Sequence, residues 1–252
     1  MSNLQARPGV GFIGRFKNGQ LNGHFWLGML HGAYLHGKVD AKGQLSGDDL
    51  AYIYPDGTTS FKGTFENKFM KSARNVDVVK YACDDNGLLI VQDFTEPLSE
   101  HVFKYDPSTN ETFGGGLPLH IRDPYEIKSV KLAPSAIPNS GEGVFLVRDV
   151  PKNQFASLYS LFLYQHPVET HLYEQSCTHN TSKSDSYRRH CKKYSLGIAS
   201  YSGVIDLPPE FDVNPLPNLG PKVNHHFRKQ NAAYMEIEHP RVRFVAEIEE
   251  NN

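Results

Sequence analysis

GRFKNGQLNG, residues 14–23, sets the pattern for the N-terminal part of the chain. The glycine spacing recurs along the chain. A similar spacing is found in Gly37-x-x-x-x-x-Gly43-x-x-x-Gly47, and a third copy begins at Gly63-x-Phe65. Short aromatic and β-branched runs fill residues 11–70, a pattern that favours strands over helices. A single hairpin cannot bury its apolar face alone, so such hairpins are stabilised by stacking. We predict a mainly β protein that begins with stacked β-hairpins; an ordinary antiparallel sheet with glycine turns is the alternative.

The hairpin turns are predicted at Asn18-Gly19, Lys42-Gly43 and Asp56-Gly57, where a glycine permits the left-handed backbone of a tight turn. Aromatic side chains of the repeats are expected mostly to fill the face of the sheet: Phe16, Phe25, Trp26, Tyr34, Tyr52, Tyr54, Phe61 and Phe65.

The glycine rhythm fades after Met70, and Asp123-Pro124 is the expected boundary before a second part, since proline biases the residue before it toward extended backbone. Short strands are expected at residues 88–91, 125–132, 144–150, 155–164 and 204–207. Residues 166–195 are polar and rich in Ser, Thr and His, which predicts a long loop.

The composition excludes several classes of protein. A chain of 252 residues with 39% hydrophobic residues can build a packed core and is not intrinsically disordered. The formal net charge of -2 gives no overall attraction to nucleic acid. No apolar run approaches the roughly 18 residues of a membrane-spanning helix, and three cysteines are too few for a disulfide framework. We expect a soluble intracellular protein.

Two segments carry ligand-binding chemistry. Asn224-His225 is a polar pair framed by Val223 and Phe227, and its donors and acceptors suit a polar cofactor. A surface turn is the plainer interpretation of that pair. The second segment, residues 140–145 (SGEGVF), has two glycines that let the backbone approach a bound molecule closely.

A third segment contains zinc-ligand types, in Cys177-x-His179 and His190-Cys191. Their spacing matches no common zinc finger, so we expect no metal site and interpret the region as a solvated insertion.

These motifs resemble known families. The glycine-punctuated hairpins resemble MORN repeats, and the Gly-Glu-Gly loop with the downstream Asn-His pair resembles the SET domain of protein-lysine methyltransferases. The segment from Leu50 to Gly57 is similar to the last repeats of the SET enzymes that carry MORN repeats. The resemblance implies MORN repeats in residues 1–70, a bridging β region in 71–124 and a SET-like domain of short sheets in 125–252.

The resemblance also implies an activity, S-adenosylmethionine-dependent methylation of lysines in histone tails or other proteins, with chromatin as a possible partner and the nucleus and cytoplasm as location. The residues that match the family's cofactor site are Ser140, Gly141, Glu142, Asn224 and His225. The tyrosines that match its lysine channel, and so the expected catalytic residues, are Tyr159 and Tyr234.

The sequence departs from the family at Arg228-Lys229-Gln230-Asn231, which keeps the asparagine but lacks the proline of the family's proline-asparagine step, and at two further places. His226 replaces a serine or cysteine, and the sequence ends at Asn252, where the family continues into a further strand and a Gly-Tyr-x-Tyr-like segment. We therefore expect an incomplete SET-like domain that transfers methyl groups poorly. The alternative function is a catalytically inactive SET-like protein that uses its MORN hairpins as an interaction or membrane-surface platform.

Overall fold

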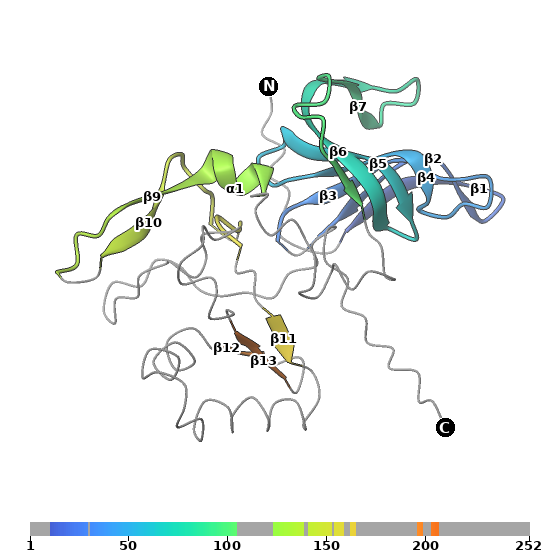
Figure 1. Ribbon diagram of the computed structural model, residues 1–252. Coiled ribbons are helices and arrows are strands. Elements are labelled where there is room, and N and C mark those ends of the chain that lie inside the picture. Colours follow the sequence, from blue (N-terminus) through green and yellow to red (C-terminus); the bar gives the residue numbers. More distant parts are fainter. Residues whose placement is uncertain are drawn as a thin grey trace, which may run out of the picture. The chain divides into compact units, whose positions relative to one another are not determined.

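A computed structural model describes residues 11–29, 31–104, 123–138, 141–152 and 154–158, together with the backbone of three short strands farther along the chain (Figure 1). The chain forms two units. Residues 11–104 and the segment around Phe155 belong to the first unit, and residues 123–148 and the later strands belong to the second. The mainly β fold predicted from the sequence is confirmed.

The first unit is an antiparallel sheet in which consecutive strands are neighbours, in the order β1-β2-β3-β4-β5-β6-β7, with β8 paired to β6. Its strands are β1 (Phe12–Lys17), β2 (Gln20–Gly28), β3 (Tyr34–Lys38), β4 (Gly47–Ile53), β5 (Thr59–Glu66), β6 (Phe69–Cys83), β7 (Leu89–Phe94) and β8 (Val102–Lys104). This row of hairpin strands is what the repeated glycines predicted.

The three predicted turns are confirmed. Asn18 and Gly19 have φ of 53° and 77°, the left-handed pair that a two-residue hairpin turn requires. Gly57 has φ of 72° and joins β4 to β5, and Gly43, with φ of 74°, lies in the connection from β3 to β4.

Gly63 is required for a different reason, close approach between strands. A Cβ at this position would lie 2.3 Å from the Ser72 carbonyl oxygen and 2.7 Å from Ala73 Cα on the paired strand β6. Any side chain here would force β5 and β6 apart.

One face of the sheet carries the main core. Side chains that alternate along β2 to β6 meet across the strands, as in the paired residues Leu35, Tyr52 and Phe61, which are fully buried. Phe103 of β8 adds an edge-to-face contact with Phe61 at 4.7 Å. The aromatic expectation holds for Phe25, Tyr52, Tyr54, Phe61 and Phe65 and is wrong for Phe16, whose side chain is 68% exposed.

The opposite face is partly covered by β7. Strand β6 is long enough to pair with β5 through its first half and with β7 through its second half, so β7 folds over the sheet. Ala51, Ile53, Val78 and Val91 form a small buried cluster beneath it. The strand expected at residues 88–91 therefore exists, but of these residues only Val91 is buried.

The described part of the second unit begins with a short helix where an extended segment was expected. Pro124–Ser129 form α1, and β9 (Val130–Pro134) pairs with β10 (Glu142–Leu146). The extended prediction for 125–132 is wrong up to Ser129, because Asp123 caps the helix with its carboxylate while keeping the extended backbone that Pro124 favours.

The remaining strands of the second unit are short. β11 (Phe162–Tyr164), β13 (Gly203–Asp206) and β12 (Leu196–Ile198) form an antiparallel sheet in that order. The strand expected at 204–207 is confirmed in β13. The strand expected at 144–150 corresponds to β10, which begins two residues earlier and ends at Leu146. Of the strand expected at 155–164, residues 162–164 form β11, residues 155–158 are not in a strand, and residues 159–161 lie outside the described residues.

The sheet of the first unit extends past Met70 through β6, β7 and β8. The domain boundaries predicted at residues 70 and 124 stay a prediction. In the described residues, no helix is long and apolar enough to cross a membrane.

Candidate active site

The structure describes two of the seven residues that the family resemblance assigned to the site. Gly141 and Glu142 lie where the β9–β10 connection enters β10. The other five lie outside the described residues: Ser140, Tyr159, Asn224, His225 and Tyr234.

The β9–β10 hairpin holds the glycine loop. Glu142 pairs with Pro134 at the end of the two strands next to the connecting loop, and the Ser135 amide donates a hydrogen bond to the Gly141 carbonyl at 2.8 Å. Gly141 has φ of 61°, and among the described residues other than its chain neighbours no atom lies within 4 Å of where its Cβ would be. The loop thus ends in a left-handed residue with open space beside it, followed at once by the exposed carboxylate of Glu142.

Helix α1 fixes the base of this hairpin. The Asp123 carboxylate is fully buried and accepts hydrogen bonds from the amides of Tyr125 and Glu126 at 3.0 and 3.3 Å. Acceptors at this position satisfy amides that the first helical turn leaves without partners. The helix therefore begins at a defined residue although it has only six residues.

Arg148 ties the end of β10 back to α1. Its guanidinium donates hydrogen bonds to the Ser129 hydroxyl, from Nη2 at 2.7 Å and from Nε at 3.1 Å, and lies 4.6 Å from the centre of the Tyr125 ring. The Ser129 hydroxyl donates in turn to the Tyr125 carbonyl at 2.7 Å. A planar cation that stacks on an aromatic ring and donates two hydrogen bonds holds both elements in one arrangement.

Glu126 is a positioning residue that the sequence reasoning missed. Its carboxylate is fully buried and accepts hydrogen bonds from the Ser157 hydroxyl and from the Leu158 amide, the latter at 3.1 Å. Buried carboxylates are retained only where such partners compensate for lost hydration. Residues 157 and 158 immediately precede Tyr159, so Glu126 anchors the segment that leads to a predicted channel tyrosine. The only signal in the sequence was its place in the Asp-Pro-Tyr-Glu boundary motif.

In the first unit, an imidazole and an indole pin β7 to the sheet. His36 donates from Nδ1 to the Phe25 carbonyl at 2.8 Å and accepts from the Val91 amide through Nε2 at 3.1 Å. Trp26 stacks on His36 at 4.1 Å and donates to the Leu89 carbonyl at 2.6 Å. Burial lowers the pKa of His36 to about 4, so the ring is neutral at pH 7 and can accept at Nε2.

The segment around Phe155 packs against the first unit's sheet through aromatic contacts. The Phe155 ring lies edge-on to His31 at 5.5 Å and 6.0 Å from Tyr54, and His31 Nε2 is 2.8 Å from the Tyr52 hydroxyl. These contacts are structural. Among the residues that the structure describes, no three His, Cys, Asp or Glu side chains are grouped to hold a metal ion.

Comparisons with known proteins show which proteins the chain is similar to. Residues 16–86 match the protein family described as the N-terminal part of the histone H3 K4-specific methyltransferase SET7. A histone-lysine N-methyltransferase SETD7 from Halocynthia roretzi is 32% identical over 240 residues, which is 94% of this chain. The chain thus carries the SET7 N-terminal family in residues 16–86 and is similar to a SETD7 protein over nearly its whole length.

These similarities confirm the resemblance drawn from the glycine repeats and the Gly-Glu-Gly loop. The SET7 N-terminal match runs from within β1 to the turn after β6, so it covers the core of the hairpin sheet. The alignment covers 56% of the SETD7 relative, so the chain spans about half the length of that protein.

Proposed function

We propose that this SET7-type chain serves S-adenosylmethionine-dependent N-methylation of lysines in histones or other proteins. The observation that carries the proposal is the similarity to a histone-lysine N-methyltransferase along 94% of the chain. The proposal extends to the nucleus and cytoplasm as the places where it acts.

The described part of the cofactor loop fits the proposed ligand. Open space beside Gly141 lets a bound molecule approach the backbone, and the exposed Glu142 carboxylate can accept hydrogen bonds from a cationic or hydroxyl-bearing ligand. S-adenosylmethionine would supply an electrophilic methyl group on a sulfonium. Ser140, Gly141, Glu142, Asn224 and His225 would hold it, while Tyr159 and Tyr234 would shape the lysine channel.

The chain's own contribution is positioning. A lysine amine attacks a methyl carbon only as the neutral base and only along the line of the bond that breaks. Tyrosine hydroxyls can orient the amine while their rings exclude water from the channel. Glu126, Ser129 and Arg148 support this by fixing α1, β10 and the residues before Tyr159 in one arrangement.

A transfer assay tests the proposal. The chain, and a version extended by a family-like C-terminal segment, would be incubated with methyl-labelled S-adenosylmethionine and histones. Label on lysine with either protein supports the proposal. Cofactor binding without label from both proteins would contradict it and favour the alternative, a SET-like interaction platform.

A further inference from the structure

A groove crosses the part of the sheet face that β7 leaves uncovered. Trp26, His36, Ala51, Lys62 and Arg74 form one row of paired residues across β2 to β6. Trp26 and Ala51 lie with the buried cluster at β7, and His36 accepts a hydrogen bond from β7. Lys62 and Arg74 line a groove of about 460 Å³. Asp48 and Asp49 of β4 line it as well, and β7 and the residues after it contribute Gln92, Asp93, Phe94, Thr95, Glu96 and Pro97.

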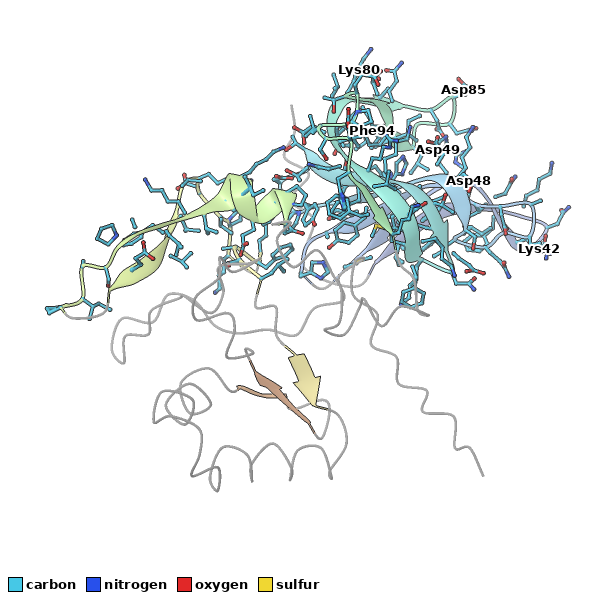
Figure 2. The ribbon with its side chains drawn as sticks, in the orientation of Figure 1. Lys42, Asp48, Asp49, Lys80, Asp85 and Phe94 are labelled. Carbon is cyan, nitrogen blue, oxygen red and sulfur yellow. The ribbon has the colours of Figure 1, made fainter. Side chains whose placement is uncertain are left out.

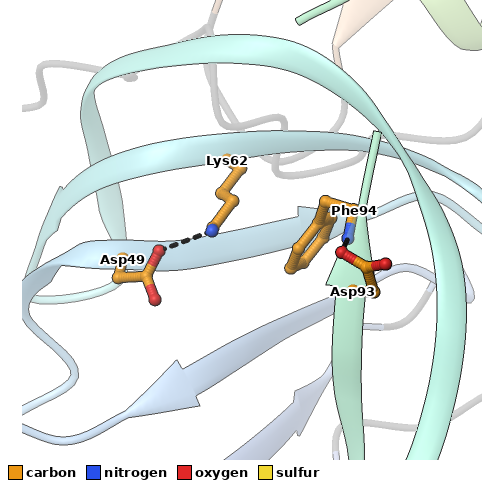
Figure 3. Close-up of polar contacts among 4 residues, drawn as sticks. All are labelled: Asp49, Lys62, Asp93 and Phe94. Atoms are coloured by element: carbon orange, nitrogen blue, oxygen red, sulfur yellow. Dashed lines mark hydrogen bonds and ion pairs between the residues drawn. The ribbon is translucent and has the colours of Figure 1, made fainter. Parts of the chain in front are cut away.

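The groove already holds one ammonium group, that of its own Lys62. Lys62 Nζ lies 2.8 Å from the Asp49 carboxylate and 4.8 Å from the centre of the Phe94 ring (Figure 3). An aromatic face and a carboxylate together are a favourable site for a cation. The side chain of Phe94 is only partly buried, so its ring also offers apolar surface to a ligand.

The charges of the groove favour a cationic ligand. Four carboxylates line it, from Asp48, Asp49, Asp93 and Glu96, against the two cations Lys62 and Arg74. Lys62 is already paired with Asp49. The carboxylates of Asp93 and Glu96 are exposed on the side formed by the end of β7, and those of Asp48 and Asp49 are exposed on β4. Figure 2 shows Phe94, Asp49 and Asp48 along this side of the sheet.

We propose that this groove binds a lysine- and arginine-bearing segment of a protein. Its cationic heads meet the carboxylates of Asp93, Glu96 and Asp48, and their aliphatic stems lie on Phe94 and Pro97, as long basic side chains do on apolar surface. The excess of carboxylates disfavours nucleic acid, whose phosphates it repels. The inference rests on the proposed function in that the methylated protein is the natural source of such a segment.

Peptide binding to the full chain tests the groove without any methyl transfer. The probe is a fluorescein-labelled peptide in which lysine and arginine alternate with glycine, measured by anisotropy in the absence of S-adenosylmethionine. A peptide with glutamate at the charged positions is its counterpart. We expect the basic peptide to bind and the acidic one not to bind.

Two double variants with the same change in net charge separate the groove from general attraction. Asp93→Asn with Glu96→Gln removes two groove carboxylates. Asp85→Asn with Glu100→Gln removes two exposed carboxylates that do not line the groove. We expect binding to weaken about five-fold in the first, the effect of losing two exposed ion pairs, and less than about two-fold in the second.

Equal weakening by both double variants, or no binding of the basic peptide to the wild-type chain, would overturn the proposal that the groove binds a basic segment. Because no cofactor is present, a negative methyl-transfer assay does not affect this result. Conversely, a result that rules out peptide binding in the groove does not contradict the proposed methylation.

Discussion

At the scale of single residues, His36 shows how a buried polar group can hold two elements together. It is 3% exposed, and both of its ring nitrogens are used, one toward β2 and one toward β7. Protonation would give Nε2 a hydrogen that faces the Val91 amide and would break that contact. The lowered pKa therefore has a consequence for stability.

The direction in which the free energy of unfolding changes with pH follows from the pKa of His36 in the folded and unfolded chain. In the unfolded chain the imidazole titrates near 6.5, and in the folded sheet burial lowers its pKa to about 4. Between these values the unfolded chain binds the extra proton, so the free energy of unfolding rises with pH across this window. The stabilisation is present above pH 6.5 and is lost as the pH falls toward 4.

We expect the free energy of unfolding of the sheet to be about 2 kcal/mol lower at pH 5 than at pH 7 because of His36. Urea unfolding followed by the fluorescence of Trp26, the only tryptophan, measures it. His36→Gln should have a lower free energy of unfolding than the wild type at pH 7, but this free energy should fall less between pH 7 and pH 5. Asn22→Ala, which changes an exposed residue of β2 without an ionisable side chain, should keep the wild-type pH dependence. The same slope for His36→Gln as for the wild type would contradict the assignment.

At the scale of elements, the sequence predicted turns well where a glycine marks them. The turn between β5 and β6 was missed because Asn67 and Lys68 occupy it, with φ of 48° and 70° and no glycine. Its support is tertiary. The Asn67 amide donates to the Ser46 hydroxyl and the Lys68 amide to the Leu45 carbonyl, each at 2.9 Å, so the β3–β4 connection props the turn. Contacts of this kind leave no local pattern.

Helix α1 was missed for a related reason. Six residues are too few to show a helical period, and the proline was correctly interpreted as a boundary but not as the first residue of a helix. The start of the helix depends on the Asp123 cap. Substitution of Asp123 therefore tests the role of this cap.

Asp123→Ala should speed amide hydrogen exchange at Tyr125 and Glu126 by about five- to thirty-fold, since losing an N-cap costs about 1 to 2 kcal/mol. Asp123→Asn keeps an oxygen acceptor and is the matched control, with a much smaller effect expected. Exchange measured by nuclear magnetic resonance reports on these amides individually. Unchanged exchange in Asp123→Ala would mean that packing alone holds the helix.

At the scale of the whole molecule, repeated glycines and one loop motif were enough to predict the family and the β architecture. The similarity to SETD7 and the SET7 N-terminal match support the family resemblance, and the strands of the structure confirm the β architecture. The positioning contacts of Glu126 and Arg148, the pinning of β7 and the charged groove could not be predicted. Each depends on residues that are distant in sequence and become neighbours only through strand pairing and helix capping.

The central claim is that the chain binds S-adenosylmethionine through the loop at Gly141-Glu142 and the pair Asn224-His225. Calorimetric titration of the cofactor into the chain tests it most directly, with Asn224→Ala as the site variant and Asn22→Ala, an exposed residue of β2, as the control. We predict binding by the wild type and by Asn22→Ala, and about ten-fold weaker binding by Asn224→Ala, the cost of losing the hydrogen bonds that the proposal assigns between its side chain and the cofactor. No binding by the wild type, or equal binding by Asn224→Ala, would contradict the claim.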